Sequence, residues 1–370
     1  MLRTINIILL NTIVLMVLMD NIIYSYTKND EQMRSISFRH TINSGYKDKP
    51  SKTYIDQSNI SLNKSAIDFR TGIDGAILPD GGTFKADSQT CLAVFMGGSS
   101  TENRWVEESK RWPSVTGNLL FEKGLNIKTK NFGVGGQNLH QSALRYLSYI
   151  EELNPNYVFI MHEANDISKF IKGGYYERES SLYNSYDIES LNFSLAERFK
   201  SIIKNLIPFS YQQFRFIRNK NSNPIAPVRK VSSSYEGLSA SDAAKEYFSR
   251  IQVINSLLIM NEAELIFIQY PHVYKEVLSG STKQNSNVRQ NLSNEIKNNG
   301  LTNDLFLDYI NDFRGELYKL LKDEGINIII FEQGTFNEQM FYDEIHFNEF
   351  GSGLFSELLV NKIIDFIDCP

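Results

Sequence analysis

The sequence has little cysteine, since only Cys91 and Cys369 occur among its 370 residues. Two cysteines are too few for a disulfide-stapled scaffold or a cysteine-rich metal site. A single bridge between them stays possible. We do not expect it, because disulfide geometry is demanding and nothing in the sequence brings the two ends of the chain together.

The chain also lacks an excess of positive charge. Its 38 lysine and arginine residues face 43 aspartate and glutamate residues, which gives a formal net charge of −5. Without a basic surface, a nucleic-acid partner is not expected. Histidines and carboxylates do not occur at the spacing of a closed metal site, and we expect neither a metal nor an organic cofactor. The 42% hydrophobic content is instead typical of a chain that folds around a core.

The amino terminus is apolar. Residues 4–19 carry no charge, and only Asp20 interrupts the run before Thr27, with Arg3 in front. Residues 1–27 therefore resemble an export signal or a membrane anchor, which would place the rest of the chain outside the cytoplasm. No small-x-small cleavage site follows, so we favour an uncleaved anchor over a removed signal peptide. The alternative is a buried helix of a cytoplasmic protein, which is disfavoured because apolar residues run all round the helix.

Residues 28–88 are polar, and the sequence Leu78-Pro79-Asp80-Gly81-Gly82 near their end predicts a reversal of the chain. Few apolar residues recur there at helical or strand spacing. We therefore expect a linker and an extension rather than a domain.

Residues 89–370 alternate short apolar runs with segments of helical spacing, which indicates an α/β domain. The runs predict five strands, at residues 91–96, 127–132, 157–161, 264–269 and 326–331. Most are apolar on both faces, as strands covered by helices on both sides are. The prediction is a three-layer α/β/α sandwich with a central five-stranded parallel sheet. The interval 168–256 is too long for one crossover and is expected to form an inserted subregion.

Reactive side chains follow these strands, at the edge where open α/β sheets bind ligands. Ser99 follows the first strand, Gly136 the second and Asn165 the third, while Asp343 and His346 follow the fifth. A serine becomes a nucleophile when a histidine takes its proton, and a carboxylate holds that histidine in one tautomer. The backbone amides of Ser99 and Gly136 and the side-chain amide of Asn165 are candidate donors to an oxyanion.

These blocks, over residues 90–366, resemble the SGNH (GDSL-type) serine hydrolase superfamily and its bacterial envelope members. The resemblance implies a flavodoxin-like sandwich with Ser99 as nucleophile, His346 as base and Asp343 as its orienting carboxylate. It also implies that Ser99, Gly136 and Asn165 form the oxyanion hole.

The match has departures. Gly98 replaces the aspartate of Gly-Asp-Ser, Glu163 stands where the third block usually has glycine, and Phe347 follows the histidine where proline is common. Glu163 is the departure with the clearest expected effect, because it could alter the backbone that aims Asn165. Three further histidines are read as structural. They are His140 at a helix start, His162 at a strand end and His272 in a loop, with substrate contact as the alternative for the last two.

The resemblance and the apolar segment together imply a membrane-anchored or secreted esterase of the bacterial cell envelope. By analogy, its substrates are acylated carbohydrates or other small esters, with O-acetyl groups on a surface polysaccharide ranked first. One alternative is an O-acyltransferase, which differs only in excluding water from the same site. The other is a non-catalytic carbohydrate-binding or assembly protein on this scaffold.

Overall fold

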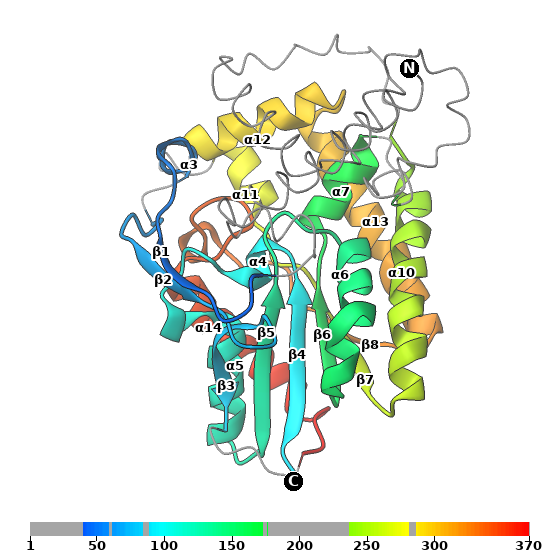
Figure 1. Ribbon diagram of the computed structural model, residues 1–370. Helices are drawn as coiled ribbons and strands as arrows, with labels where there is room; N and C mark the ends of the chain where they lie inside the picture. Colours follow the sequence, from blue (N-terminus) through cyan, green and yellow to red (C-terminus); the bar gives the residue numbers. More distant parts are fainter. Residues whose placement is uncertain are drawn as a thin grey trace, which may run out of the picture. The chain divides into compact units, whose positions relative to one another are not determined.

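The computed structural model describes residues 40–58, 61–83, 89–172, 176, 237–280 and 286–369 (Figure 1). Residues 1–27, with the predicted signal or anchor, lie outside this part, and so does most of the predicted insertion. Within the described residues, no helix is both long and apolar enough to cross a bilayer.

A six-stranded sheet forms the centre of the described fold. Its strands lie in the order β3 (Ile77–Gly82), β5 (Ile127–Gly133), β4 (Cys91–Gly97), β6 (Tyr157–Met161), β7 (Glu264–Ile268) and β8 (Asn327–Ile329). The five strands from β5 to β8 run parallel, which confirms the five predicted strands. Numbered along the chain, these five follow the order 2-1-3-4-5 of flavodoxin-like sheets. In such sheets, ligands bind where the strand order reverses, beside the carboxyl ends of β4 and β6.

The sixth strand corrects the prediction of a purely parallel, five-stranded sheet. Strand β3 pairs antiparallel with β5, with an irregular register between Ile77 and Gly81. The turn predicted at residues 78–82 is therefore wrong, because these residues form an edge strand. Pro79 is tolerated there, since an edge strand does not need its N–H for a hydrogen bond to a neighbouring strand. Gly81 and Gly82 permit close packing, since a Cβ at either position would collide with the backbone of Ser114 or Ile127.

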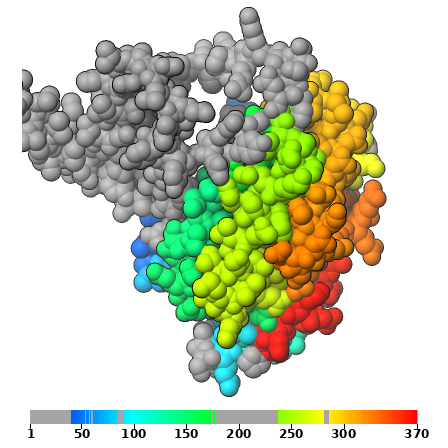
Figure 2. Space-filling model, turned by 90° about the vertical axis from the view of Figure 1, so that its right-hand side faces the viewer, coloured from blue at the N-terminus to red at the C-terminus, as the bar shows by residue number. Residues whose placement is uncertain are grey.

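Helices cover both faces of the sheet (Figure 1). One face packs against α5 (Trp112–Glu122) and α14 (Glu349–Ile363). The other packs against α6 (Leu139–Arg145), α10 (Ala240–Met260) and α13 (Asn303–Asp323). Figure 2 shows α10 in yellow-green and α13 in orange side by side on this second face. Helix α10 starts inside the region predicted as an insertion, so residues 240–256 belong to the covering layer.

Aromatic side chains fill both layers of the core. On the first face, the Trp112 ring lies edge-on to Phe95 of β4 and to Phe355 of α14, at centroid distances of 4.9 and 5.1 Å. On the second face, Tyr247 of α10 contacts Phe267 of β7. Fully burying a ring such as Phe95 stabilises the fold by about 1.5–3 kcal/mol. These contacts hold the strands rigidly beneath their carboxyl ends.

The two cysteines form a disulfide, contrary to our expectation. Cys91 opens β4 and Cys369 follows α14, and their Cα atoms are 5.9 Å apart. The carboxyl-terminal tail is held at this edge because the Asp368 N–H donates to the Tyr157 hydroxyl at 2.8 Å. Which edge of the sheet the last residues reach depends on how α14 packs, and a cysteine count does not reveal this.

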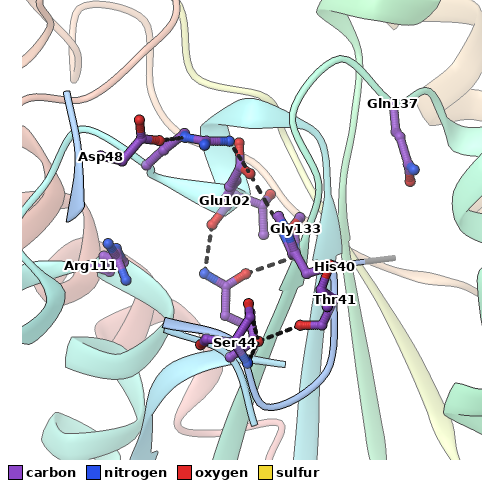
Figure 3. Close-up of polar contacts among 12 residues, drawn as sticks. His40, Thr41, Ser44, Asp48, Glu102, Arg111, Gly133 and Gln137 are labelled. Atoms are coloured by element: carbon purple, nitrogen blue, oxygen red, sulfur yellow. Dashed lines mark hydrogen bonds and ion pairs between the residues drawn. The ribbon is translucent and has the colours of Figure 1, made fainter. Parts of the chain in front are cut away.

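The described part of the polar amino-terminal stretch packs on the domain. Strand β1 (Gly45–Asp48) pairs antiparallel with β2 (Ile67–Arg70), and α3 (Lys52–Gln57) lies between them in sequence. The His40 ring donates to the Gly133 carbonyl at 3.0 Å and lies 3.4 Å from Glu102 (Figure 3). Arg104 pairs with Asp48. The stretch is thus fixed to the carboxyl end of β5 and to the segment after β4.

Candidate active site

Ser99 lies directly after β4, at the first position of α4 (Ser99–Glu102). A Cβ at Gly97 would collide with the Thr101 side chain and the Met161 backbone, so only glycine permits this turn. A Cβ at Gly98 would lie 3.1 Å from Nδ2 of Asn165, which is tighter than ordinary contact. The two glycines therefore let the serine turn approach the end of β6.

Asp343 and His346 lie in a tight loop between β8 and α14. The Tyr342 N–H donates to the His346 carbonyl at 3.0 Å, and the Tyr342 ring stacks on the imidazole at 5.5 Å between centroids. The N–H groups of Ile345 and His346 donate to Oδ1 of Asp343 at 2.9 and 2.7 Å. Phe347, where proline was expected, is buried against Phe341 and anchors the loop.

The structure brings Ser99, His346 and Asp343 together from these two loops. Oγ of Ser99 lies 2.7 Å from Nε2 of His346, and Nδ1 of His346 lies 2.6 Å from Oδ2 of Asp343. These distances match a serine hydroxyl that donates to a neutral imidazole, whose second nitrogen donates to a carboxylate.

Asp343 and His346 each stabilise the charged form of the other. Burial alone would lower the pKa of His346, but Asp343 outweighs it and holds that pKa above its ordinary value. Burial alone would raise the pKa of Asp343, but His346 and the two loop N–H groups hold it below its ordinary value. At neutral pH, Asp343 is therefore an anion, poised to stabilise an imidazolium.

Tyr54 of α3 is a further residue of this site, and we did not identify it in the sequence. Its hydroxyl donates to Oδ2 of Asp343 at 3.1 Å and lies 3.4 Å from Nδ1 of His346. Burial and the neighbouring Tyr342 and Asp343 raise the pKa of Tyr54, so its hydroxyl stays protonated. No motif marks this tyrosine, because it lies in the polar stretch that we interpreted as a linker and extension.

Gly136 follows β5 and Asn165 follows β6, and Nδ2 of Asn165 lies 3.1 Å from where a Cβ at Gly98, next to Ser99, would be. Gly136 has φ +76°, in the left-handed region that favours glycine. Asn165 donates one Nδ2 hydrogen to the Gln137 carbonyl at 2.7 Å, and the amide carries a second hydrogen for a ligand. The Ser99 N–H is at the first position of its helix and has no acceptor within that helix. These three candidate donors thus follow the carboxyl ends of β4, β5 and β6, which are neighbours in the sheet.

Glu163, the residue in place of glycine, points away from this cluster into a buried ion pair. Both its carboxylate oxygens accept from Arg314 of α13, at 2.7 and 2.8 Å. Arg314 also donates to the Tyr270 carbonyl, and the Tyr270 hydroxyl lies 2.5 Å from Oγ of Ser100. The departure therefore braces the loops beside Asn165 and Ser99.

The other histidines take structural positions. His162 is buried at the end of β6, with its Nε2 2.7 Å from Oγ of Ser142, and burial together with Arg145 lowers its pKa to about 3. His140 is the second residue of α6. His272 lies in the loop after β7, where its ring is tilted against that of Tyr274 at 4.4 Å between centroids and its Nε2 is 4.0 Å from Glu163. In the described ranges, no group of three or more His, Cys, Asp or Glu side chains could hold a metal ion.

Two hollows lie near the triad, one lined by Asp343 and the other by Asn165 and by Ile345, the neighbour of His346. One is a polar cleft of about 510 Å³ that includes Tyr54, Asp343 and Glu344 and one flank of α12 (Ser286–Asn298). The other is an apolar pocket of about 140 Å³ that includes Asn165, Ile345 and side chains of α7 (Ala164–Ile171). Glu344 lines both, and burial and the neighbouring Asp343 raise its pKa to about 8.

Comparison with known proteins gives a family. The family model described as GDSL-like Lipase/Acylhydrolase matches residues 93–359. Among solved structures, an acetyl xylan esterase (AlAXEase) is 14% identical, with 73% of this chain and 98% of that chain covered and a TM-score of 0.39. A GDSL-like lipase of Bacteroides thetaiotaomicron is 13% identical, with 75% and 89% covered and a TM-score of 0.37. TesA is 10% identical, with 75% and 99% covered and a TM-score of 0.40. The search of curated proteins found no match.

Proposed function

Since this chain belongs to the GDSL-like lipase/acylhydrolase family and is a carboxylic ester hydrolase, we propose that it hydrolyses short acyl esters with Ser99 as nucleophile. The observation that carries the proposal is the continuous hydrogen-bonded line from Ser99 through His346 to Asp343, at 2.7 and 2.6 Å. Such a line gives the hydroxyl a base within proton-transfer distance.

The geometry supports a two-step reaction. Oγ of Ser99 attacks the ester carbonyl carbon while its proton passes to Nε2 of His346. The tetrahedral intermediate then collapses, the bond to the leaving alcohol breaks, and His346 returns the proton to the alcohol oxygen. In the second step, water attacks the acyl-enzyme and gives its proton to His346. The bond between the acyl carbon and Oγ of Ser99 breaks, His346 returns the proton to Oγ, and the acid leaves with the serine restored.

Charge that develops on the carbonyl oxygen needs donors that are already in place. The N–H groups of Ser99 and Gly136 and the free Nδ2 hydrogen of Asn165 are those donors in our proposal. Removing one such donor typically costs about 10²–10³ in rate. Asn165 is held for this task by the Gln137 carbonyl, so it needs no reorganisation during the reaction.

The pocket beside Asn165 favours a small acyl group. Its volume of about 140 Å³ is below the ~300–1,000 Å³ of ordinary ligand sites, and Ile167, Ile345 and Phe306 contribute apolar surface. An acetyl or similarly short chain is the group that we place there. O-acetyl groups on a cell-envelope glycan are our first-ranked substrates.

The proposed location is outside the cytoplasm, at the bacterial cell envelope. Two independent features support it. The uncharged run of residues 4–19 is typical of export or anchoring, and the disulfide between Cys91 and Cys369 is typical of an oxidising compartment.

Hydrolysis of 4-nitrophenyl esters by the purified full-length protein tests the proposal. We expect activity that falls steeply from acetate to octanoate and is lost in Ser99→Ala and in His346→Ala. Melting curves that match the wild type show that both variants fold. A folded wild type that cleaves no ester contradicts hydrolysis. Transfer of the acetyl group to an added sugar in preference to water would favour the acyltransferase instead.

A further inference from the structure

The cleft beside Asp343 is larger than the pocket beside Asn165, and the family assignment does not say what occupies it. Its volume of about 510 Å³ lies within the usual range of small-molecule sites. One wall is α12, and another is α3 of the amino-terminal stretch, outside the residues that match the family. The Asn287 side chain donates to the Asp56 carbonyl at 3.0 Å and joins these two walls.

Helix α12 contributes both apolar and polar side chains to the cleft, whose lining includes Val288 and Leu292. Val288, Leu292 and Ile296 are buried and anchor the helix. Three exposed asparagines lie on the cleft side at spacings of three, four and seven residues, which places them on one helix face. They are Asn291, Asn294 and Asn298.

The asparagine side chains are available to a ligand. Across the described segments, none of the three carboxamides has a hydrogen-bond partner within the protein. Each carboxamide offers two donors and an acceptor, which suits hydroxyl groups that both donate and accept. Asparagine is also one of the weaker helix formers, so helix stability does not explain three of them on one exposed face.

The charges of the cleft nearly cancel. Lys172 lies 3.6 Å from Glu295, and both line the cleft. Asp343 is engaged by His346 and Tyr54. The raised pKa of Glu344 leaves its carboxyl mostly protonated at neutral pH. An uncharged, hydroxyl-rich ligand therefore fits better than an anion or a long acyl chain.

We propose that this cleft is the leaving-group subsite, in which the three carboxamides of α12 bind the hydroxyls of an uncharged oligosaccharide while its acyl group reaches Ser99. The inference rests on the proposed esterase function and divides the site in two. The sugar lies against α12 and α3, and the acyl group enters the smaller pocket beside Asn165. After hydrolysis, the deacylated oligosaccharide leaves from the cleft.

The test compares two kinds of substrate in one variant. The triple variant Asn291→Ala, Asn294→Ala and Asn298→Ala is assayed on O-acetylated xylo-, cello- and chito-oligosaccharides and on 4-nitrophenyl acetate. We expect kcat/KM on the best acetylated oligosaccharide to fall about tenfold or more, mainly through KM, while kcat/KM on 4-nitrophenyl acetate stays within about twofold. Alanine is a better helix former than asparagine, so α12 should remain folded.

A matched control changes exposed residues of the same helix that do not line the cleft. Gln290→Ala with Lys297→Ala is expected to leave kcat/KM unchanged on every substrate. An equal loss on both substrates in the triple variant, or no loss on any oligosaccharide, overturns the inference.

A binding measurement separates this inference from the esterase proposal. Calorimetry with the unacetylated oligosaccharides and the Ser99→Ala protein needs no catalysis. Binding that the three alanines abolish supports the subsite even if no ester is cleaved. If none of the three oligosaccharides binds, or if an oligogalacturonate binds more tightly than all of them, the inference of an uncharged-sugar subsite is wrong.

Discussion

The Tyr54 hydroxyl donates a hydrogen bond to Oδ2 of Asp343 at 3.1 Å, although 289 positions separate the two residues. Asp343 thereby has four partners, because the imidazole and two loop N–H groups also donate to it. Tyr54 belongs to α3, which precedes the part of the chain that matches the family. The amino-terminal stretch therefore completes the surroundings of the triad.

Tyr54→Phe tests this contact. Tyr54 is a positioning residue that acts through Asp343, so we expect kcat to fall about 3- to 10-fold on 4-nitrophenyl acetate, in proportion to one lost hydrogen bond. Without this donor, Asp343 attracts the imidazolium more strongly, and the acid limb of the pH profile should move to higher pH. Tyr46→Phe, which removes a hydroxyl that Arg104 contacts, is the control. An unchanged pH profile in Tyr54→Phe would show that the tyrosine only packs.

The pH dependence follows from the protonation state of His346. The base must be neutral to accept the Ser99 proton, and Asp343 holds the pKa of His346 above its ordinary 6.5. Activity is therefore low at acid pH and rises as His346 loses its proton. We expect kcat/KM to reach half its plateau above pH 6.5.

Asp343→Asn reverses this effect. Without the carboxylate, the half-maximal pH should move down, and kcat should fall by about 10⁴, the loss seen when such a histidine loses its orienting carboxylate. The measurement is kcat/KM from pH 5 to 9 for both proteins. A midpoint that stays in place in Asp343→Asn would contradict the assignment of His346 as the titrating base.

The pair Glu163–Arg314 is expected to stabilise the fold only as a pair. The two side chains are 4% and 13% exposed, so Arg314→Met leaves a buried carboxylate without its cation. We expect a loss of about 3–5 kcal/mol in the free energy of unfolding. Adding Glu163→Gln should recover most of that loss. Urea denaturation measures both.

Lys47→Met breaks an exposed ion pair with Asp68 and is the control for that experiment. The side chains of Lys47 and Asp68 are 70% and 56% exposed. We therefore expect Lys47→Met to change the free energy of unfolding by less than about 1 kcal/mol. If Arg314→Met were no more destabilising than Lys47→Met, the buried pair would not brace the loops as described.

The disulfide should affect stability without affecting catalysis. Strand β4 separates Cys91 from Ser99, at roughly 3.3 Å per residue over seven residues, so the bond lies far from the chemistry. We expect the double variant Cys91→Ser, Cys369→Ser to lose about 2–5 kcal/mol of stability and to keep its kcat at 25 °C. Thermal melting with and without a thiol reductant checks this. A wild type that reductant does not destabilise would argue against the bond.

The sequence predicts the parts of this site that lie next to strand ends. Ser99 and Asn165 follow continuous apolar runs that predict buried strands, whereas Gly136 follows the more polar run 127–132, and Asp343 and His346 share one loop. By contrast, Tyr54, Arg314 and Cys369 reach their partners only through tertiary packing, which local periodicity does not reveal. Strand β3 was missed because Pro79 and two glycines give an edge strand the appearance of a turn.

The central claim is that Ser99 carries the acyl group, and covalent labelling tests it most directly. The full-length protein is treated with a fluorophosphonate, which traps activated serines, and intact and peptide masses are measured. We predict one adduct per chain, on the peptide that contains Ser99, with no adduct in Ser99→Ala and strongly slowed labelling in His346→Ala. No adduct on folded wild type, or an adduct on another residue, would contradict the account.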